Sequence, residues 1–266
     1  MLGDFTLVLN MINRMVILLT LFFVYSLPHA KAVSPCIDYS TKNEKRVHIL
    51  AIDLSCPNIK IIGTPEGEAD TTSSFALKNN VTVAINGTFF DENRSPMGLN
   101  VTSGLHIKPY KDTARYSFFA CTKEKICFIE PSNSISTISL DWDFVISGWQ
   151  TLKNGKFYCE TQDQTSKCMR NGNYHHPRTA LGLSKDGKIL YMIVVEGRQL
   201  DFRGYTLSEL AQEFKKLDVP LALNLDGGGS TTMVVKGVRV NRLPSGQFFI
   251  ERSVANHIGI IDSTPN

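Results

Sequence analysis

One segment of the sequence places an acid, three glycines and three hydroxyls directly after a mainly apolar run. Residues 221–225 form that run, and Asp226, the glycines at 227–229 and a Ser-Thr-Thr triplet at 230–232 follow it. Glycines lack a Cβ atom, so they permit left-handed backbone conformations and let a ligand approach the amide groups closely. The pattern predicts a polar-ligand site at the end of a buried strand. The alternative is a tight turn in which Asp226 only accepts hydrogen bonds from local amides.

Four polar side chains stand at the ends of predicted strands, where rigid scaffolds usually present reactive groups. They are Asn86, Arg178, Glu196 and Asp226. Glu196 follows the apolar residues 191–195 much as Asp226 follows its own run, and two carboxylates presented alike suggest the acid and base partners that glycosidic cleavage commonly uses. The alternative for Glu196 is a salt bridge to Arg198 or Arg203 at the strand exit.

Arg178 follows two histidines and a proline and precedes a predicted strand. A guanidinium offers a fixed fork of donors that matches phosphate or carboxylate oxygens, so beside a glycine-rich loop it predicts an anion site. An isolated arginine is more often a surface or ion-paired residue. His175 and His176 are candidates for metal binding or proton transfer, although adjacent side chains point in different directions along an extended chain.

The elements that must position these residues are mainly strands. Strands are predicted at 47–54, 58–62, 81–85, 180–183, 188–195, 231–235 and 238–240, the first two as neighbours. Asp186-Gly187 predicts a two-residue hairpin turn, because such turns need positive φ angles. Thr206 and Glu209 form a capping box before an amphipathic helix, and a shorter helix is predicted at 71–78. We therefore expect an α+β fold, a single domain with a mixed β-sheet core and a few helices.

The first residues are typical of a secretory signal peptide. Arg14 precedes an apolar run from 15 to 27, and Ala30-Lys31-Ala32 has the small residues of a cleavage site. The run is shorter than the about 20 residues of a membrane span, although an uncleaved anchor is the alternative. Cleavage after residue 32 would leave 33–266 as a secreted or periplasmic domain without a stable membrane span.

The charge of the chain is nearly balanced. The formal net charge is +3, and no cluster of lysines and arginines stands out. Nucleic acid is therefore not an expected partner.

Six cysteines lie after the predicted cleavage site, an even number that suits an oxidising compartment. Spacing does not select among the possible pairings, and our prediction is that neighbours pair. The pairs are Cys36 with Cys56, Cys121 with Cys127, and Cys159 with Cys168. Zinc binding is disfavoured because no two cysteines have the spacing of a zinc site.

Six segments occur in an order that resembles the phosphodiester glycosidase family. They are Asn86-Gly87-Thr88-Phe89-Phe90, His176-Pro177-Arg178-Thr179-Ala180-Leu181-Gly182, Glu196-Gly197-Arg198, Gly204-Tyr205-Thr206-Leu207-Ser208-Glu209-Leu210, Asn224-Leu225-Asp226-Gly227-Gly228-Gly229-Ser230-Thr231-Thr232-Met233 and Arg252-Ser253-Val254-Ala255-Asn256. The resemblance covers about 81–261, and the ordered set is more specific than any one motif. Thr88 stands where the family usually has Gly or Ala, and Glu196 where Asp is common.

The resemblance implies hydrolysis of a sugar-1-phosphodiester, since the namesake of the family removes N-acetylglucosamine from such a group. It implies Asp226, Glu196 and Arg178 as catalytic residues. The implied substrate-binding residues are Asn86, His176, Gly227, Gly228, Gly229, Ser230 and Thr231. In this scheme Arg178 and the amides of the glycine loop hold the departing phosphodiester. Asp226 acts near the anomeric carbon and Glu196 is the second acid or base.

Two other functions remain open from the residues. One is a binding module that recognises a phosphorylated envelope glycan without cleaving it. The other is a metal-assisted phosphodiesterase with Asp226, Glu196 and His176 as ligands. The sequence predicts no specific cofactor, and binding of a divalent cation is an alternative. The expected partner in the enzymatic case is a small molecule or glycan that carries a sugar phosphodiester.

Overall fold

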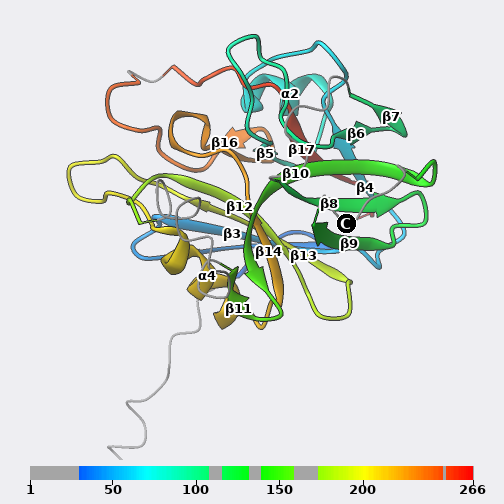
Figure 1. Ribbon diagram of the computed structural model, residues 1–266, viewed down its shortest axis with the longest axis horizontal. Coiled ribbons are helices and arrows are strands. Elements are labelled where there is room, and N and C mark those ends of the chain that lie inside the picture. The colour runs from blue at the N-terminus through cyan, green and yellow to red at the C-terminus, as the bar shows by residue number, and fades with distance from the viewer. Residues whose placement is uncertain (1–29, 108–115, 132–138, 159–172, 248–249, 266) are drawn as a thin grey trace, which may run out of the picture.

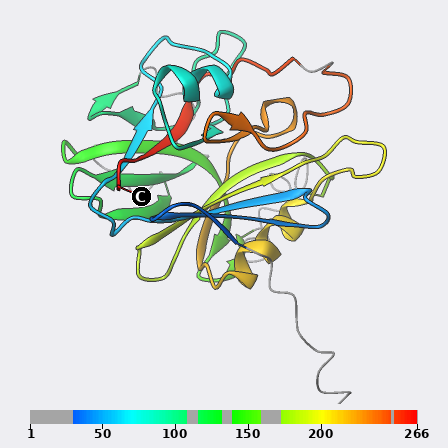
Figure 2. The same cartoon turned by 180° about the vertical axis from the view of Figure 1, so that it is seen from behind.

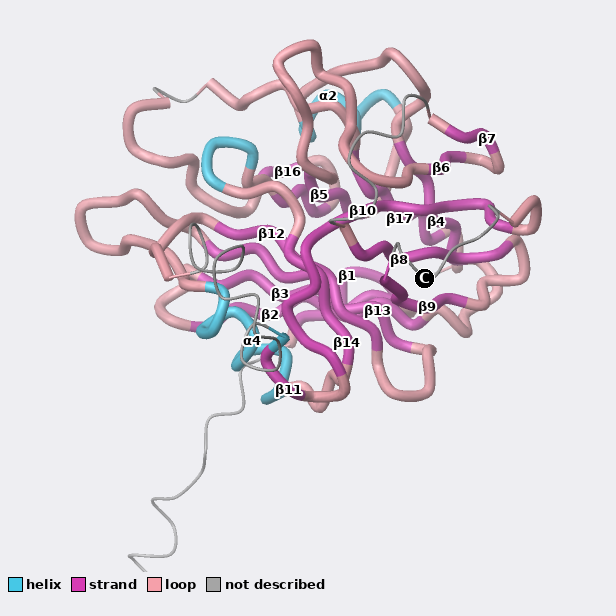
Figure 3. Tube along the Cα trace, in the orientation of Figure 1, coloured by secondary structure: helices cyan, strands magenta, loops and turns pink. Residues whose placement is uncertain are grey.

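The computed structural model describes residues 30–107, 116–131, 139–158, 173–247 and 250–265. Within them the chain forms two β-sheets that pack against each other, and strands dominate the structure (Figures 1 and 3). The larger sheet runs in the order β1 (Lys31–Ser34), β2 (Ile37–Lys42), β3 (Val47–Asp53), β13 (Ile189–Val195), β12 (Arg178–Leu183), β14 (Leu221–Asn224), β10 (Trp142–Lys153), β6 (Val101–Thr102) and β7 (Leu105–His106). Strands β8 (Ser117–Thr122), β9 (Cys127–Pro131) and β11 (Lys156–Phe157) join it around β10. The smaller sheet runs in the order β16 (Val238–Arg239), β15 (Met233–Val235), β5 (Val83–Asn86), β17 (His257–Asp262) and β4 (Ile59–Gly63).

The sheets differ from the expected mixed core because every strand pair in the described residues is antiparallel. Antiparallel neighbours can be joined by short turns, whereas parallel neighbours need long crossovers. The described part of the chain contains only two α-helices, so the α+β description holds for a fold that is dominated by sheets.

Strands β12 and β13 form the predicted hairpin, with Arg178 opposite Val195 at one end and Leu183 opposite Leu190 at the other. The turn is longer than the predicted two residues, and within it only Gly187 has a positive φ, of 74°. Strand β3 pairs with β13 and not with β4, which lies in the smaller sheet, so the expectation that these two strands are neighbours was wrong.

The two helices each cover the outer face of one sheet (Figure 1). Helix α4 (Leu207–Lys216) begins with the predicted capping box of Thr206 and Glu209. It packs its apolar face on β10 and β14 and shares a core cluster with residues of β3, β12 and β13. Helix α2 (Thr72–Lys78) is capped by the Thr71 side chain and covers the smaller sheet through Phe75. The main core lies between the sheets.

Two of the predicted disulfides are present, Cys36–Cys56 and Cys121–Cys127. The predicted Cys159–Cys168 pair lies outside the described residues. The first disulfide ties the β1–β2 turn to the segment before β4, and the blue strands β1, β2 and β3 are seen side by side from behind (Figure 2).

Residues 1–29 of the predicted signal peptide lie outside the described part of the chain. Its predicted cleavage site falls within β1, where Lys31 and Ala32 are exposed and Val33 is the first buried residue. Cleavage there would remove no described core residue. Neither helix of the described chain is long and apolar enough to cross a membrane.

Candidate active site

The chain around Asp226 is held by residues at the ends of β5, β12 and β14. The Asp226 amide donates to the Gly87 carbonyl at 3.1 Å, and the Asn86 side-chain amide donates to the Asp226 carbonyl at 2.7 Å. The Asn86 oxygen accepts from the Thr179 hydroxyl at 2.7 Å and from the Thr232 amide at 3.1 Å. Asn86, which was predicted to bind substrate, is fully buried and uses both ends of its amide to fix the backbone of the site.

Burial is the largest influence on the Asp226 carboxyl and raises its pKa above the ordinary value. The Gly227 amide donates to Oδ1 at 2.9 Å and opposes the rise, as do the nearby charges of Arg252 and Arg198. The Ser230 hydroxyl lies near enough to lower the pKa as well, although its geometry falls short of a hydrogen bond. A carboxyl with a raised pKa next to cationic groups is suited to proton transfer or to stabilising a developing positive charge.

The glycine loop folds as a single 3₁₀ turn at Gly228–Ser230. Gly227 donates to Asp226, Gly228 donates to the Pro177 carbonyl at 2.9 Å, and Ser230 donates to the Gly227 carbonyl at 3.1 Å. The loop's own structure thus engages these three amides, and the idea that the amides from 227 to 230 together hold an anion stays a prediction.

Two arginines lie directly over this loop. A Cβ atom on Gly228 would come within 2.9 Å of Arg198 Nη2, and one on Gly229 would come within 3.0 Å of the Arg252 guanidinium. Both arginines are exposed, and both bear electrostatically on Asp226. The absence of side chains at 228 and 229 thus lets two guanidinium groups approach the backbone beside the acid, and such a pair matches phosphate oxygens.

Arg178 lies beside the loop, but the residue is only 4% exposed and its guanidinium donates to other backbone groups. Its Nε donates to the Tyr205 carbonyl and its Nη2 to the Tyr174 carbonyl, each at 2.9 Å. Burial and the neighbouring charge of Arg198 lower its pKa to about 10. Arg178 therefore fixes the segments around Tyr174 and Tyr205 and adds to the positive potential of the site.

Glu196 is 2% exposed and has donors at both oxygens. Oε1 accepts from the Arg242 amide at 2.7 Å and lies 3.3 Å from His48 Nε2, while Oε2 accepts from Arg242 Nε at 2.9 Å. His48 Nδ1 in turn lies 2.7 Å from the Tyr39 hydroxyl, whose pKa burial and Glu196 raise to about 12. The alternative of a salt bridge is thus observed, with Arg242 in place of Arg198 or Arg203.

The Glu196–Arg242 pair anchors the segment that follows β16, and this segment holds the far side of the glycine loop. Asn241 donates to the Thr231 carbonyl and accepts from the Met233 amide, and Gln247 donates to the Gly229 carbonyl at 3.1 Å. Glu196 therefore supports the shape of the loop through a chain of contacts.

His176 joins the site through its backbone, which forms a two-residue bridge with Tyr205. Its Nδ1 is buried without a hydrogen-bond partner in the described residues. Burial, followed by the charges of Arg178, Arg198 and His175, lowers the pKa of His176. Its neighbour His175 points elsewhere and lies 3.3 Å from a Glu209 oxygen.

A row of buried hydroxyls continues from the loop. Ser230, Thr231 and Thr232 are each 1% exposed, and none of their hydroxyls has a hydrogen-bond partner within the described residues. The side-chain oxygen of Asn224 has none either. Buried polar groups in proteins are almost always paired with protein or ordered water, so these four atoms are candidates for bonds to water or to a polar ligand.

The described residues contain no group of three histidines, cysteines or acids that could hold a metal ion. Asp226 lies under Arg198 and Arg252, and Glu196 is bonded to Arg242, so these carboxylates face cationic side chains. The arrangement thus gives no support to the hypothesis of a metal held by Asp226, Glu196 and His176.

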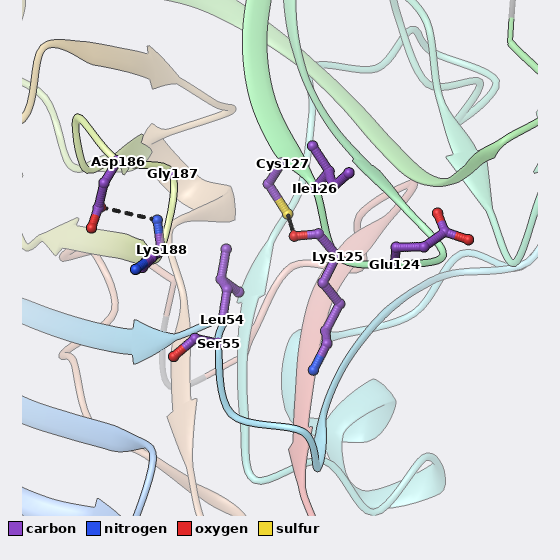
Figure 4. A pocket seen from close by; sticks show the side chains of 9 residues that line it. All are labelled: Leu54, Ser55, Glu124, Lys125, Ile126, Cys127, Asp186, Gly187 and Lys188. Carbon is purple, nitrogen blue, oxygen red and sulfur yellow. Dashed lines mark hydrogen bonds between the residues drawn. The ribbon is translucent and has the colours of Figure 1, made fainter.

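A pocket of about 320 Å³ lies away from this site, and Figure 4 shows its lining. It is lined by Leu54, Ser55, Glu124, Lys125, Ile126, Cys127, Asp186, Gly187 and Lys188. These residues surround the β12–β13 turn, whereas Arg178 and Glu196 stand at the other end of the same hairpin. The pocket and the Asp226 loop are therefore separated by the length of the strands.

Sequence reasoning missed Arg198, Arg252 and Arg242 as partners of the site. Arg198 and Arg252 lie within the motifs that carried the family resemblance, and this was the available signal. Arg242 lies in no motif, so only its contact with Glu196 in the folded chain reveals it.

Comparisons with known proteins identify the family of the chain. A family model described as phosphodiester glycosidase matches residues 79–261. The SPbeta prophage-derived uncharacterized protein YomE of Bacillus subtilis is 30% identical over 77% of this chain and 31% of its own length. N-acetylglucosamine-1-phosphodiester alpha-N-acetylglucosaminidase of Bos taurus is 30% identical over 63% of this chain and 33% of its own length. The chain thus spans about a third of the length of these relatives.

A solved structure shares the fold. The catalytic domain of zebrafish N-acetylglucosamine-1-phosphodiester alpha-N-acetylglucosaminidase, auto-inhibited by its pro-peptide, superimposes with a TM-score of 0.67 and 22% sequence identity. The match covers 87% of this chain and 85% of that one.

Proposed function

The chain belongs to the phosphodiester glycosidase family, and on that basis we propose that it hydrolyses the glycosidic bond of a sugar-1-phosphodiester on an exported or envelope glycan. The observation that carries the proposal is the placement of Arg198 and Arg252 over the glycine loop next to the partly buried Asp226. A sugar of the N-acetylglucosamine type is the first candidate, because the bovine relative is named for that substrate.

In the proposed reaction the two arginines hold the phosphodiester through their guanidinium groups. The bond between the anomeric carbon and the phosphate oxygen breaks, and the bonding electrons leave with the phosphate. The cations stabilise the charge that develops on the departing oxygen. The departing group is a phosphate monoester, a good leaving group that needs little help from a general acid. Water supplies the new oxygen at the anomeric carbon and gives up a proton.

Asp226 acts on the sugar side of that bond. Its carboxylate stabilises the oxocarbenium-like transition state through its charge, attacks the anomeric carbon as a nucleophile, or takes a proton from the attacking water as a base. Because Glu196 is bonded to Arg242 and His48, we assign it to the support of the loop. Asn86 and Arg178 likewise fix the backbone, and the hydroxyls of Ser230 and Thr231 contact the substrate.

Hydrolysis of a methyl N-acetylglucosamine 1-phosphodiester in ¹⁸O-labelled water tests this proposal. Cleavage at the anomeric carbon releases free sugar carrying the label, whereas cleavage at phosphorus places the label in a phosphate product. Labelled sugar from the wild type and none from the Asp226→Asn variant is the expected result. Label in the phosphate would instead establish a phosphodiesterase.

One observation favours a second candidate, a module that binds phosphorylated glycan without cleaving it. Glycosidases generally use two carboxyl groups, and here Glu196 is engaged by Arg242. Saturable binding of the same phosphodiester with no product after prolonged incubation would support this candidate over the enzyme.

The two disulfides of the described chain are typical of an oxidising compartment, and we propose a secreted or periplasmic location with residues 1–32 as the signal peptide. The mature amino terminus, read by mass spectrometry of the exported protein, tests this. A first residue other than Val33 would place the cleavage elsewhere.

A further inference from the structure

A pair of aromatic side chains stacks at the edge of the site. The rings of Phe89 and Trp149 lie 4.4 Å apart between centroids with an interplanar angle of 28°, and both side chains are only partly buried. Tyr116, which is buried, supports the pair from 6.0 Å. The stack is therefore a fixed apolar surface that retains contact with solvent.

Two separate stretches of chain bring this pair to Asp226. Trp149 on β10 lies directly opposite Asn224 on β14, and side chains opposite each other in an antiparallel pair share one face of the sheet. Asp226 follows Asn224 by two residues, so Trp149 lies beside the strand end that leads into Asp226. Phe89 follows Gly87 by two residues, and the Gly87 carbonyl accepts the Asp226 amide.

The order of groups along the site gives it a direction. The aromatic pair stands beside Asn224, Asp226 comes next, and the arginines lie over Gly228 and Gly229. The acid thus lies between an apolar platform and a cationic clamp. A sugar-1-phosphodiester has the same order, with a ring, a scissile bond and an anion.

We propose that Phe89 and Trp149 form the platform on which the pyranose ring of the substrate stacks, with its phosphodiester directed toward Arg198 and Arg252. A pyranose presents C–H groups on its faces, which pack on an aromatic surface, and hydroxyls at its edge. The buried Asn224 oxygen, which has no hydrogen-bond partner in the described residues, is placed to accept from such a hydroxyl. This assignment rests on the proposed function and names which part of the substrate each end of the site takes.

Tryptophan fluorescence tests the platform directly, because the chain has only two tryptophans, Trp142 and Trp149. The Trp142→Phe variant reports on Trp149 alone. The Trp149→Phe variant reports on Trp142, which lies farther along β10 in tilted contacts with Phe118 and Phe128. Both are titrated with N-acetylglucosamine, glucose and galactose in an Asp226→Asn background. We expect a saturable change with at least one sugar in the first variant and none in the second.

No response of Trp149 to any of the three sugars up to their solubility limits would overturn the assignment, as would equal responses of both variants. Thermal melting of each variant verifies that it is folded. Response to inorganic phosphate without response to sugar would also overturn it.

Kinetics supply a second readout. Trp149→Leu should weaken inhibition by the free sugar product about tenfold, the size expected for loss of one aromatic contact, and leave inhibition by inorganic phosphate unchanged. Trp149→Phe should retain most of the sugar affinity, and Trp142→Leu serves as the matched loss of a tryptophan on the same strand. Equal weakening of sugar and phosphate inhibition in a folded Trp149→Leu protein would contradict the platform.

The failure of this assignment and the failure of the proposed function are distinguishable. Sugar binding at Trp149 without hydrolysis would leave the platform standing and refute the enzyme. Hydrolysis with an unresponsive Trp149 would do the reverse.

Discussion

Replacing Glu196 by glutamine separates a role in chemistry from a role in support. The carboxylate receives the Arg242 amide, Arg242 Nε and the His48 ring. A glutamine keeps one acceptor oxygen and presents an NH₂ group where the second was, so at least one donor then faces another donor.

The magnitude follows from the burial of the two partners. Loss of a hydrogen bond to a charged group costs about 1.5–3 kcal/mol. Breaking a fully buried ion pair costs about 3–5 kcal/mol, and this is an upper bound because the Arg242 side chain is 50% exposed and can turn to water. We expect Glu196→Gln to lower the free energy of unfolding by about 2–3 kcal/mol, or the melting temperature by roughly 4–12 °C.

The effect on activity should be that of a displaced loop. We expect kcat/KM for the sugar phosphodiester to fall about tenfold, mostly through KM, with the shape of the pH–rate profile retained. Arg242→Gln should give a similar loss, and the double variant little more, because residues that act as a unit are not additive.

Glu213→Gln is the matched control. Glu213 is also buried and paired with Lys42 and Lys216, but it lies on α4 away from the glycine loop. It should lose stability and keep kcat/KM. If Glu196→Gln instead loses more than about 100-fold in kcat and one limb of its pH profile, while Arg242→Gln stays active, Glu196 is a general acid or base and our reasoning is refuted.

Three further predictions concern the charged groups of the site. Asp226→Asn should lose at least about 100-fold in kcat. Because the folded pKa of Asp226 is raised above 3.8, the wild type should lose stability relative to this variant as pH rises from below 3.8 through the folded pKa. Equal melting temperatures of the two proteins at all pH values would contradict this. Arg198→Ala and Arg252→Ala should each weaken inhibition by inorganic phosphate about tenfold, the size of a lost charged hydrogen bond. Lys188→Ala, at the far end of the hairpin, should leave this inhibition unchanged. Unchanged inhibition in both arginine variants would exclude phosphate binding by Arg198 and Arg252. The lowered pKa of His176 predicts a neutral ring at neutral pH, and phosphate should raise that pKa in an NMR titration; a pKa unmoved by bound phosphate would place the anion elsewhere.

Local signals in the sequence predicted individual elements well. The capping box at Thr206 and Glu209 marked the start of α4, because those contacts involve residues three apart in the chain. The Asp186-Gly187 turn marked the β12–β13 hairpin for a similar reason. Pairing of cysteines with their neighbours is confirmed for two pairs, since short loops bring such residues together.

Partners that are distant in the chain were not predictable. Strand β3 follows the chain toward β4 but pairs with β13, more than a hundred residues away, and alternating hydrophobicity carries no information about that choice. The motif around Arg178 indicated an anion-binding guanidinium, yet the folded chain directs this one to the carbonyls of Tyr174 and Tyr205. Residue type states what a side chain can bond, and its neighbours in space determine what it does bond.

The order of residues was therefore sufficient to identify the family from its motifs. It also identified the loop around Asp226, the caps and the turns, because these depend on contacts within a few positions. The tertiary structure alone assigned Glu196 to Arg242 and His48, placed Arg198 and Arg252 over glycines 228 and 229, and set Phe89 against Trp149. Those contacts join segments separated by tens to more than a hundred residues. They form only when the whole chain has folded, because no local pattern brings these segments together.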